Sequence, residues 1–558
     1  MKSYVIAYDV GTTGIKTCLF ELSGKLKLIA GATESYNLYM LENGGVEQNP
    51  GEWWQAMGDT TKRVLRESNI AAGQIKGISF CAQMQGVVLV DRNGAPVRRG
   101  MSYMDNRAKR ELEEGLATGI RISGINIYKL LNSILITGAV AASVKDPVWK
   151  YKWVERNEPE NFKKVYKWLD VKEFLILKAT GEYVMTEDSA FATLLYCPRK
   201  GRKGFSKKIC AMLGVDPKHL PRVVKSTEMV GRITKKAAQE LGLKEGTPVF
   251  GGGGDASLIG VGAGAVKEGS THIYLGTSGW VSTVVGKQIL DIGHKIASIT
   301  GAGELFYNYF AELETAGKCL EWVKDHLALD EINIYLQKKD ICQSRESVYM
   351  SLYDYMMEAV KNVPAGSNGV IFTPWLHGNR CPFEDPNARG MFFNISLETG
   401  KTELIHSVLE GICYHLRWQL EAAEKKAPAS QVIRLAGGGA LAPLTCQILS
   451  DVLGREIEVV DNPQNTGAVG AAVVIAVGLG IIEKIEDAEK LITIKTRYSP
   501  NKNNTTVYNR YFKVFKSLYQ KNRKAFRILN SENQPALPAR GEKNDQHHKQ
   551  AKRIFPIR

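Results

Sequence analysis

A short Thr-rich turn that occurs twice, each time between two apolar segments, constrains the fold of this chain most strongly. The sequence reads GTTG at residues 11–14 and GTSG at residues 276–279. Alternating and β-branched residues on both sides of each turn predict paired strands, so each turn closes a hairpin. The four strands are predicted at residues 4–8, 15–20, 271–275 and 280–285. A four-residue match can arise by chance, but a match that includes the flanking strands indicates two domains of similar build.

The length and composition agree with two folded domains. The chain has 558 residues, of which 44% are hydrophobic and 23% charged, an ordinary balance for globular proteins. Helical and strand-like segments alternate through both halves, which favours an α/β architecture. Beyond the hairpins we expect helices at residues 50–67, 317–326, 403–423 and 443–453, and strands at 78–82, 85–90, 248–250, 432–436 and 457–460. The three glycines at 437–439 are predicted to form a loop.

Four consecutive glycines at residues 251–254 mark the predicted domain boundary. They suit a hinge or a close approach of the backbone to a ligand. We therefore expect a first domain over residues 1–250 and a second over 251–497. Within 498–530, apolar residues at helical spacing among lysines and arginines predict an amphipathic helix that packs on the body: Tyr508, Tyr511, Phe512, Phe515, Leu518 and Tyr519. The remainder, 531–558, is predicted to be a basic disordered tail.

Charge and cysteine content argue against several classes of protein. The net charge is +15, but residues 498–558 contain 14 Lys and Arg against 3 acidic residues, so the body is nearly neutral. Basic tails of this kind are more often solvated than bound, and we expect no nucleic-acid partner. The nine cysteines form no CxxC pair, the N-terminus does not resemble a signal peptide, and the apolar run at 467–482 is too short for a membrane span. A cytoplasmic location without membrane contact is expected.

The two turns have the composition of phosphate-binding loops. Glycines let backbone N–H groups approach an anion, and Thr and Ser add hydroxyl donors. Either turn by itself, at residues 11–13 or 276–278, is as well explained by an ordinary hairpin. Two of them, one in each half of the chain, are suited to grip one nucleotide from both sides.

Two aspartates stand where a phosphoryl-transfer site needs carboxylates. Asp9 lies directly before the first turn, where it suits a Mg²⁺ ion that bridges phosphate oxygens, or simply an Asx turn. Asp255 directly follows the four glycines and precedes a run of small residues. It is either a helix N-cap or a base that takes the proton of an attacking hydroxyl.

A dinucleotide-binding enzyme is the rival interpretation. Gly437–Ala442 fits GxGxxA after a predicted strand, and Asp461 follows at a suitable distance for the ribose of a dinucleotide. Residues 251–256 fit the same loose pattern. An NAD-dependent oxidoreductase would leave the repeated Thr-rich hairpins unexplained.

Ten motifs in a fixed order resemble the FGGY carbohydrate kinases, and among these the xylulokinase branch is most similar. The motifs are DVGTTGIKTCLF, ENGGVEQNPGEWW, AQMQG, YMDNR, GGGGD, YLGTSGW, GNRCPFEDPNARGMFF, SVLEG, LAGGGA and NTGAVGAA. The resemblance covers residues 4 to about 480. It implies two ribonuclease-H-like, actin-type domains that flank a cleft, with the sugar held mainly by the first and ATP mainly by the second.

The resemblance also implies roles for individual residues. Asp255 matches the catalytic base and Asp9 the carboxylate associated with Mg²⁺. The nucleotide would be held by positions in both halves: Gly11, Thr12, Thr13 and Lys16, then Gly276, Thr277 and Ser278, then Gly437, Gly438, Gly439 and Asn465.

The sugar-binding motifs depart from the xylulokinase pattern. That pattern has Met-His where this chain has Met84 and Gln85, and Trp where it has Tyr103; Asp105 and Arg107 are retained. The Gly-Glu-Arg-Thr-Pro motif of the family reads Gly-Asn-Arg-Cys-Pro at residues 378–382. Exchanging an imidazole for an amide changes which hydroxyl pattern is satisfied.

The sequence therefore favours an ATP- and Mg²⁺-dependent kinase of a ketose or polyol of about five carbons, with D-xylulose as the first candidate and a possible homodimer as the assembly. A nucleotide-gated sugar sensor of the same fold is the non-catalytic alternative. The presence of both Asp9 and Asp255 argues against a sensor, because a sensor does not need a base.

Overall fold

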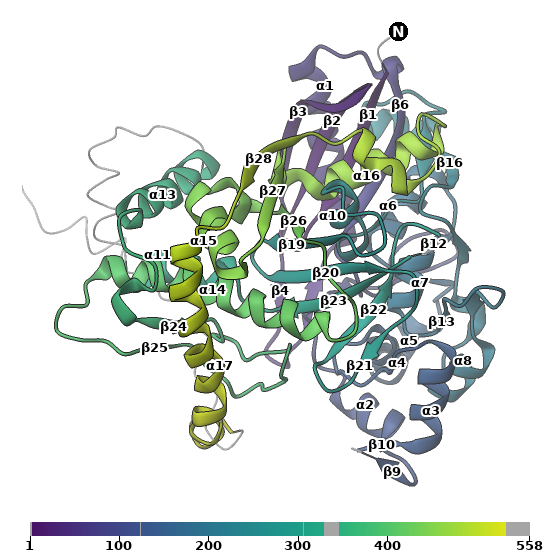
Figure 1. The fold of residues 1–558 in the computed structure, drawn as a ribbon. Coiled ribbons are helices and arrows are strands. Elements are labelled where there is room, and N and C mark those ends of the chain that lie inside the picture. The colour runs from purple at the N-terminus through teal and green to yellow at the C-terminus, as the bar shows by residue number, and fades with distance from the viewer. Residues whose placement is uncertain (1–2, 123, 305, 328–344, 532–558) are drawn as a thin grey trace, which may run out of the picture.

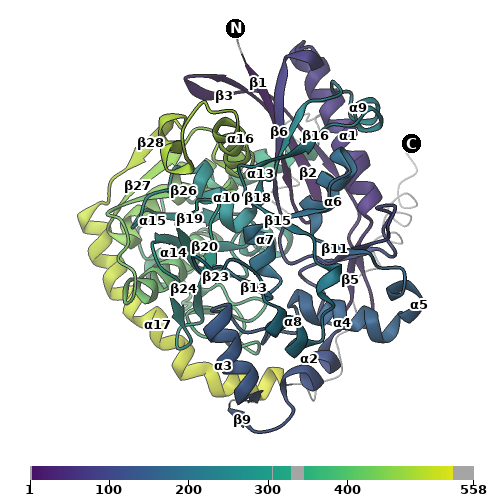
Figure 2. The ribbon, with the colours of Figure 1, turned by 90° about the vertical axis from the view of Figure 1, so that its right-hand side faces the viewer.

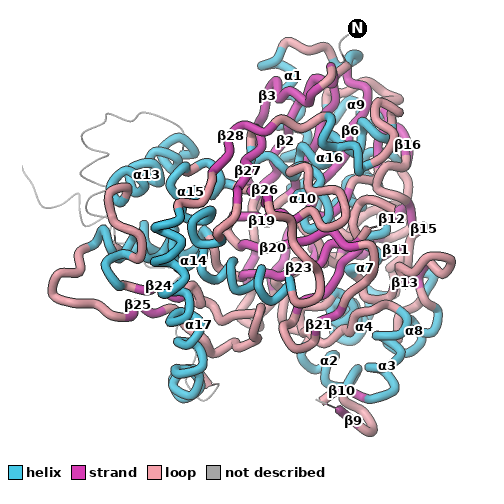
Figure 3. Tube along the Cα trace, in the orientation of Figure 1, coloured by secondary structure: helices cyan, strands magenta, loops and turns pink. Residues whose placement is uncertain are grey.

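Two mixed β-sheets form the centre of the molecule, and helices surround them (Figures 1 and 3). The computed structural model describes residues 3–122, 124–304, 306–327 and 345–531. The first sheet has the strand order β16-β17-β6-β1-β2-β3, and β18 also pairs with β6. Its strands are β1 Tyr4–Val10, β2 Gly14–Ser23, β3 Lys25–Ser35, β6 Ile75–Ala82, β16 Met229–Arg232, β17 Pro248–Phe250 and β18 Gly253–Gly254.

The second sheet repeats the central pairing of the first. Its order is β21-β22-β23-β20-β19-β26-β27-β28. In the first sheet β1 pairs antiparallel with β2 and parallel with β6, and in the second β19 pairs antiparallel with β20 and parallel with β26. The strands are β19 Thr271–Leu275, β20 Gly279–Val285, β21 Leu290–Asp291, β22 Ile296–Thr300, β23 Tyr307–Leu313, β26 Val432–Ala436, β27 Glu456–Val460 and β28 Ile494–Tyr498. The repeated hairpin predicted from the two turns is confirmed.

The four helices predicted from periodicity at residues 50–67, 317–326, 403–423 and 443–453 are also present. The four are α1 Pro50–Ser68, α11 Gly317–His326, α14 Lys401–Glu424 and α15 Pro443–Leu453. Helix α1 begins after Asn49, whose side chain accepts from Gly51 N, and ends at Asn69 in the left-handed conformation. The other helices outside the sheets include α2 Lys109–Leu116, α3 Ile127–Ile136, α4 Pro147–Asn157, α5 Pro159–Phe162, α6 Val171–Thr180, α7 Glu187–Ala192, α8 Lys207–Leu213, α9 Lys235–Leu241 and α13 Arg345–Val360.

Two predicted elements differ from the structure. The strand expected over 85–90 is only β7 Val88–Val90, because Gln85 has φ +63° and turns the chain before the strand begins. The glycine run at 437–439 does not stay a loop but enters a 3₁₀ helix, η4 Gly438–Leu441. Both differences fall where the backbone takes a conformation that periodicity does not report.

Helices α10 Asp255–Gly262 and α16 Thr466–Gly478 pack against each other and connect the sheets. Helix α16 lies between β27 and β28 of the second sheet in sequence but packs on β1 and β6 of the first. Its residues 466–476 are buried, which accounts for the apolar run at 467–482. Among the described residues, we find no helix long and apolar enough to cross a bilayer. The predicted domain boundary after residue 250 stays a prediction, although β18 carries the first sheet on to Gly254.

The last described helix, α17 Lys502–Asn530, is the predicted amphipathic helix and lies along the edge of the molecule (Figure 2). Asn501 caps its N-terminus, and its apolar stripe is buried in the core of the second half. Phe515 is fully buried, with its ring 5.8 Å from that of Trp375 and 5.5 Å from that of Tyr414. The disordered tail predicted for 531–558 lies, apart from Ser531, outside the described residues.

We expect Phe515→Ala to lower the free energy of unfolding by about 3 to 5 kcal/mol, because it removes a buried ring and leaves a cavity. Thermal and urea unfolding followed by circular dichroism would measure the change. The matched control is Ile528→Ala on the same helix, where the side chain is 68% exposed and little change is expected. Equal losses for both variants would show that α17 does not stabilise the body through its apolar stripe.

Candidate functional site

The first Thr-rich turn is held from behind through its carbonyl groups. Gly11 N donates to Gly14 O at 2.9 Å, and the Tyr36 hydroxyl donates to the carbonyls of both residues. The Gln83 amide donates to Gly11 O at 3.1 Å, and the Gln48 amide to Thr12 O at 2.6 Å. Tyr36 N donates to Thr13 O at 3.1 Å. Because protein donors occupy the carbonyls of the turn, its negative ends face the protein, and the opposite face suits an anion.

The second turn is built in a similar way, with a helix N-terminus in place of side chains. Gly276 N donates to Ser278 O at 2.9 Å. Backbone N–H groups at the start of α11 bind the carbonyls of Gly276 and Thr277 at 2.9 to 3.2 Å. A Cβ at Gly276 would lie about 2.5 Å from the Tyr274 ring, so this position requires glycine. The turn therefore lies directly beside the start of α11, whose N–H groups also favour negative charge.

Asp9 and Asp255 come to the same edge of the first sheet. Asp9 is opposite Cys81 on β6, and Cys81 is in turn opposite Gly253 on β18. Strands β1, β6 and β18 are parallel, so their carboxyl ends meet, and Asp255 follows β18 directly. No sequence pattern indicates that Cys81 lies between the two carboxylates.

Asp9 is paired across the hairpin with Lys16. Burial raises the pKa of the Asp9 carboxyl, and the charge of Lys16 and a hydrogen bond from Cys81 oppose this rise. Lys16 Nζ also donates to Gln464 O at 3.0 Å, so it reaches the segment that contains Asn465. A Cβ at Gly467 would lie 2.8 Å from Asp9 Oδ2, which means that the start of α16 approaches this carboxylate closely.

Asp255 is the first residue of α10, and Gly254 is the N-cap, so the N-cap interpretation of Asp255 is wrong. Its Oδ1 accepts from Ala256 N at 2.8 Å. Burial raises the pKa of this carboxyl to about 7, against the lowering effect of that hydrogen bond, and the charges of Asp9, Glu312 and Asp188 raise it further. A carboxylate with a pKa near neutrality can both accept and release a proton.

The glycine run at 437–439 lies against the second turn. Gly437 has φ +92°, and its N donates to Pro463 O at 2.8 Å. A Cβ there would lie 2.4 Å from Leu275 O, the residue before the turn. Asn465 is buried at the end of the 3₁₀ helix η5 Pro463–Asn465 and directly precedes α16. The structure thus gathers Gly437, Asn465 and the 276–278 turn at one end of the second sheet.

Two of the predicted sugar residues lie between the first turn and Asp255. The Thr12 hydroxyl lies 3.4 Å from the Tyr103 hydroxyl, and the charge of Asp255 acts on Tyr103. Burial is the main cause that raises the pKa of the Tyr103 phenol. Met84 packs on Gly254, where a Cβ would lie 2.1 Å from its sulfur. Gln85, next to Met84, is partly exposed.

Asp105 and Arg107 bind each other instead of facing open space. Arg107 Nη2 lies 2.7 Å from Asp105 Oδ2 and 2.6 Å from Glu47 Oε1. Val46 N also donates to Asp105 Oδ2 at 2.9 Å, and the guanidinium lies 4.4 Å from the centroid of the Trp153 ring. Asp105 is fully buried. In this structure the pair therefore fixes the loop at 102–107, and a direct contact of Asp105 with a sugar stays a prediction.

Family models show the family to which this chain belongs. The N-terminal domain of the "FGGY family of carbohydrate kinases" matches residues 4–262, and the C-terminal domain of the same family matches residues 272–479. This chain is an FGGY carbohydrate kinase. It is therefore a phosphotransferase, and the family's phosphate donor is ATP. The alternative of an NAD-dependent oxidoreductase is wrong, and the glycine run at 437–439 does not indicate a dinucleotide.

Curated relatives of this kinase include more than one activity. A xylulose kinase of Bacillus subtilis (strain 168) is 28% identical over 523 residues, which cover 92% of this chain and 96% of the relative. A gluconokinase of the same strain is 26% identical over 524 residues, with 93% and 96% covered. A solved gluconate kinase from Lactobacillus acidophilus superposes with a TM-score of 0.80 at 21% identity, covering 95% of this chain and all of that one. A Plasmodium falciparum glycerol kinase with ADP gives 0.74 at 18%, with 92% and 98% covered. The structures support the fold of two actin-type domains.

The sequence analysis did not single out several charged residues whose charges act on Tyr103 or Asp255, or that pair with those residues. Arg380 Nη1 lies 2.7 Å from Glu312 Oε2 on β23, and Lys145 Nζ lies 3.9 Å from Glu314 Oε1. The charges of Glu312 and Glu314 both act on Tyr103, so they face the predicted sugar residues. Only Arg380 had a sequence signal, in the motif at 378–382.

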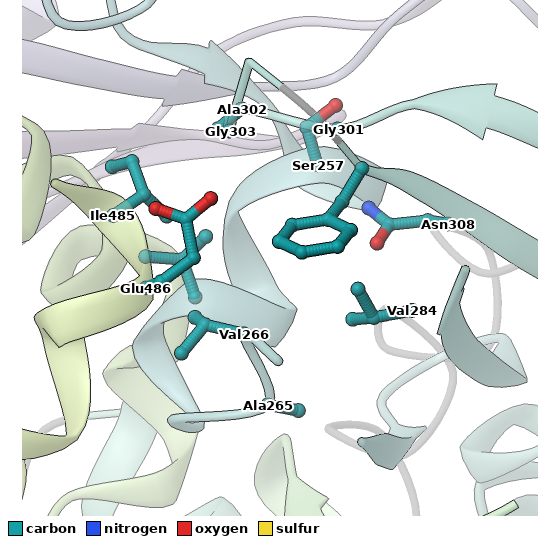
Figure 4. Close-up of a pocket in the computed structure, with 12 residues that line it drawn as sticks. Ser257, Ala265, Val266, Val284, Gly301, Ala302, Gly303, Asn308, Ile485 and Glu486 are labelled. Carbon is teal, nitrogen blue, oxygen red and sulfur yellow. The ribbon is translucent and has the colours of Figure 1, made fainter. Parts of the chain in front are cut away.

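A small pocket lies beside α10 and is separate from these residues. Figure 4 shows Ser257, Asn308 and Glu486 around it, from α10, β23 and the segment before β28. None of its described lining residues is one of the predicted site residues. Asn308 also binds Ala256 O at 3.0 Å, so the pocket borders the contact between α10 and the second sheet.

We expect Asp255→Asn to stabilise this kinase at pH 8 more than at pH 5. The carboxyl has a pKa of about 7 in the fold against an ordinary value of 3.8, so the folded protein binds more protons than the unfolded chain between these values. Stability is therefore lost as the pH rises through this window, and the amide removes that loss. Melting temperatures of the wild type and of Asp255→Asn at pH 5 and pH 8 would measure this difference in stability. Asp59→Asn, at an exposed position of α1, is the control, and a pH-independent difference for Asp255→Asn would contradict the assignment.

Proposed function

We propose that this chain is an ATP- and Mg²⁺-dependent kinase of a neutral ketose or polyol of about five carbons, with D-xylulose as the first candidate. The observation that carries the proposal is the meeting of Asp255 with Asp9 and Tyr103 beside the first Thr-rich turn. Phosphoryl transfer depends mainly on positioning and on neutralising charge around an in-line attack. These residues supply both requirements.

Asp255 is proposed as the base. It takes the proton of the sugar hydroxyl as the hydroxyl oxygen forms its bond to the γ-phosphorus and the bond from that phosphorus to the β–γ bridging oxygen breaks, which releases ADP. The Ala256 N–H that binds Oδ1 keeps the carboxylate oriented, so Oδ2 is the oxygen that faces the hydroxyl. A pKa of about 7 suits this exchange at neutral pH.

Asp9 is proposed to hold Mg²⁺, which neutralises phosphate charge when bound. The donor set fits, because Mg²⁺ is usually bound through one or two carboxylates together with water and phosphate oxygens. The described residues contain no cluster of three or more His, Cys, Asp or Glu side chains that could hold a metal by themselves. A single buried aspartate beside a phosphate-binding turn is therefore the arrangement expected for a metal that arrives with the nucleotide.

The nucleotide is proposed to lie between the two turns. Residues 11–13 and 276–278 supply N–H and hydroxyl donors to the phosphates, with the Lys16 ammonium beside Asp9. Gly437, Gly438, Gly439 and Asn465 lie beyond the second turn and suit the nucleoside. The close approach of Gly437 to Leu275 keeps this surface free of side chains.

Charge favours a neutral sugar over a sugar acid, although a gluconokinase is among the relatives. Around Asp255 the charges of Asp9, Glu312 and Asp188 are negative. Three cations of this region are already paired: Arg380 with Glu312, Lys145 with Glu314, and Arg107 with Asp105 and Glu47. A fourth, the Lys150 ammonium, donates to the backbone carbonyls of Gln85 and Ser102. The carboxylate of gluconate would meet repulsion from the acidic residues, and each of these four cations already has partners. Possible dimerisation stays a prediction.

An ADP-release assay with ATP and Mg²⁺ tests the substrate class. The panel contains D-xylulose, L-xylulose, D-ribulose, L-ribulose, glycerol, erythritol and gluconate. We expect one neutral ketose or polyol to exceed gluconate in kcat/KM by at least about a hundredfold, since an unpaired buried charge is costly. Preference for gluconate would overturn the neutral-sugar proposal. No turnover on any sugar, with ATP still bound, would support the sensor alternative.

We expect Asp255→Asn to lower kcat by about 10² to 10⁴, the usual contribution of a general base, while the Kd of ATP stays within about twofold. In the wild type, kcat/KM for the sugar should fall below pH 7 as Asp255 becomes protonated. Steady-state kinetics from pH 5.5 to 8.5 and calorimetric titration with ATP would measure both. Substantial phosphoryl transfer by the variant would show that Asp255 is not the base. A wild-type kcat/KM that does not fall below pH 7 would show the same.

A further inference from the structure

Lys150 is a buried lysine that binds backbone carbonyls. It lies on α4, and its side chain is fully buried. Its Nζ donates to Gln85 O at 2.7 Å and to Ser102 O at 2.9 Å. Within the described residues, it makes no ion pair at salt-bridge distance. Burying an ammonium group without a direct counter-ion is unfavourable, so packing by itself does not explain a lysine at position 150.

The two carbonyls belong to the two loops that carry the predicted sugar residues. Gln85 follows Met84 in the loop after β6, and Ser102 precedes Tyr103 in the loop after β8 Gly100–Met101. The second loop continues to the Asp105–Arg107 pair. The ammonium group of Lys150 therefore fixes the distance between the two loops.

The peptide group between Gln85 and Gly86 is held at both ends. Lys150 binds its carbonyl, and Asp170, the N-cap of α6, accepts from its N–H at 2.9 Å through Oδ1. A Cβ at Gly86 would lie 2.6 Å from that oxygen, so only glycine permits the contact. Gln85 has φ +63°, a strained conformation for a residue with a side chain, and such strain persists where the surroundings over-determine it. The two contacts supply that over-determination and fix the direction of the Gln85 side chain.

The electrostatics of Lys150 agree with this role. Burial lowers the pKa of its ammonium group to about 8, and the charges of Asp105, Asp170 and Asp146 oppose the change. With a pKa of about 8 the group is mostly charged near neutral pH, while its hydrogen bonds go to the loops. A charged donor makes stronger hydrogen bonds to carbonyls than a neutral one.

We propose that Lys150 is a positioning residue that ties the Gln85 loop to the Tyr103 loop and so determines which neutral sugar this kinase accepts. The inference rests on the sugar site under the proposed function. It assigns selectivity to a residue whose ammonium group donates to the main chain of the two loops.

The test compares Lys150→Met with Lys167→Met. Lys167 is the matched control, because its Nζ also bridges two backbone carbonyls of the same half, Lys218 O at 2.7 Å and Leu220 O at 2.9 Å. We expect Lys150→Met to raise the sugar KM about tenfold or more and to narrow the difference in kcat/KM between ketose epimers. The KM and Kd of ATP should stay within about twofold. Lys167→Met should leave all of these values within about twofold.

A double-mutant cycle with Gln85→Ala separates positioning from general destabilisation. If Lys150 acts through Gln85, the double variant should raise the sugar KM little more than the worse single variant. Independent, multiplying effects would overturn the proposal, and so would a Lys150→Met enzyme with wild-type sugar KM and epimer preference. If Lys150→Met does not fold, Lys150→Gln keeps a buried donor of shorter reach, and the same pattern is expected.

The result distinguishes this inference from the proposed function. A wild-type enzyme that phosphorylates a neutral sugar, with Lys150→Met unchanged, would leave the function standing and remove the role of Lys150. A wild-type enzyme that phosphorylates no neutral sugar would overturn both.

Discussion

The close contact between α10 and α16 is the constraint on which the site depends. A Cβ at Gly262 would lie 1.9 Å from Thr466 O, and one at Gly470 would lie 2.2 Å from Leu258 O, so each helix presents a glycine to the backbone of the other. No side chain fits between backbones at this distance. The start of α10 is also bound to the second sheet, since the Ser257 hydroxyl donates to Thr300 O at 3.2 Å. The two halves therefore meet through two closely packed helices.

The chemistry follows from where these helices begin. Helix α10 starts with Asp255 at the end of β18, and α16 starts beside Asp9 at the end of β1. Their crossing sets the positions of both carboxylates and encloses them, and this enclosure raises both pKa values.

Much of this arrangement was predictable from local sequence. The repeated hairpins, the helices of the second half and the stripe of α17 follow from periodicity, because each element buries one face. The residues around Gln85 alternate in polarity as in a strand, and this pattern predicts a strand that includes Gln85. Its positive φ depends instead on Lys150 and Asp170, which are 65 and 85 residues away. The N-cap interpretation of Asp255 failed for a related reason, since Gly254 is fixed by Asp188 on α7, whose Oδ2 accepts from Gly254 N at 2.7 Å.

The sequence by itself determined the repeated hairpins, their two Thr-rich turns and the pair of aspartates, because glycine, threonine and aspartate act there through local backbone geometry. Only the tertiary structure decided which charged and polar side chains lie close enough to act on one another. Cys81 lies between Asp9 and Asp255, Glu312 faces Arg380, and Lys150 joins two loops. These contacts join residues far apart along the chain, and their strength depends on burial and distance, which no local pattern records.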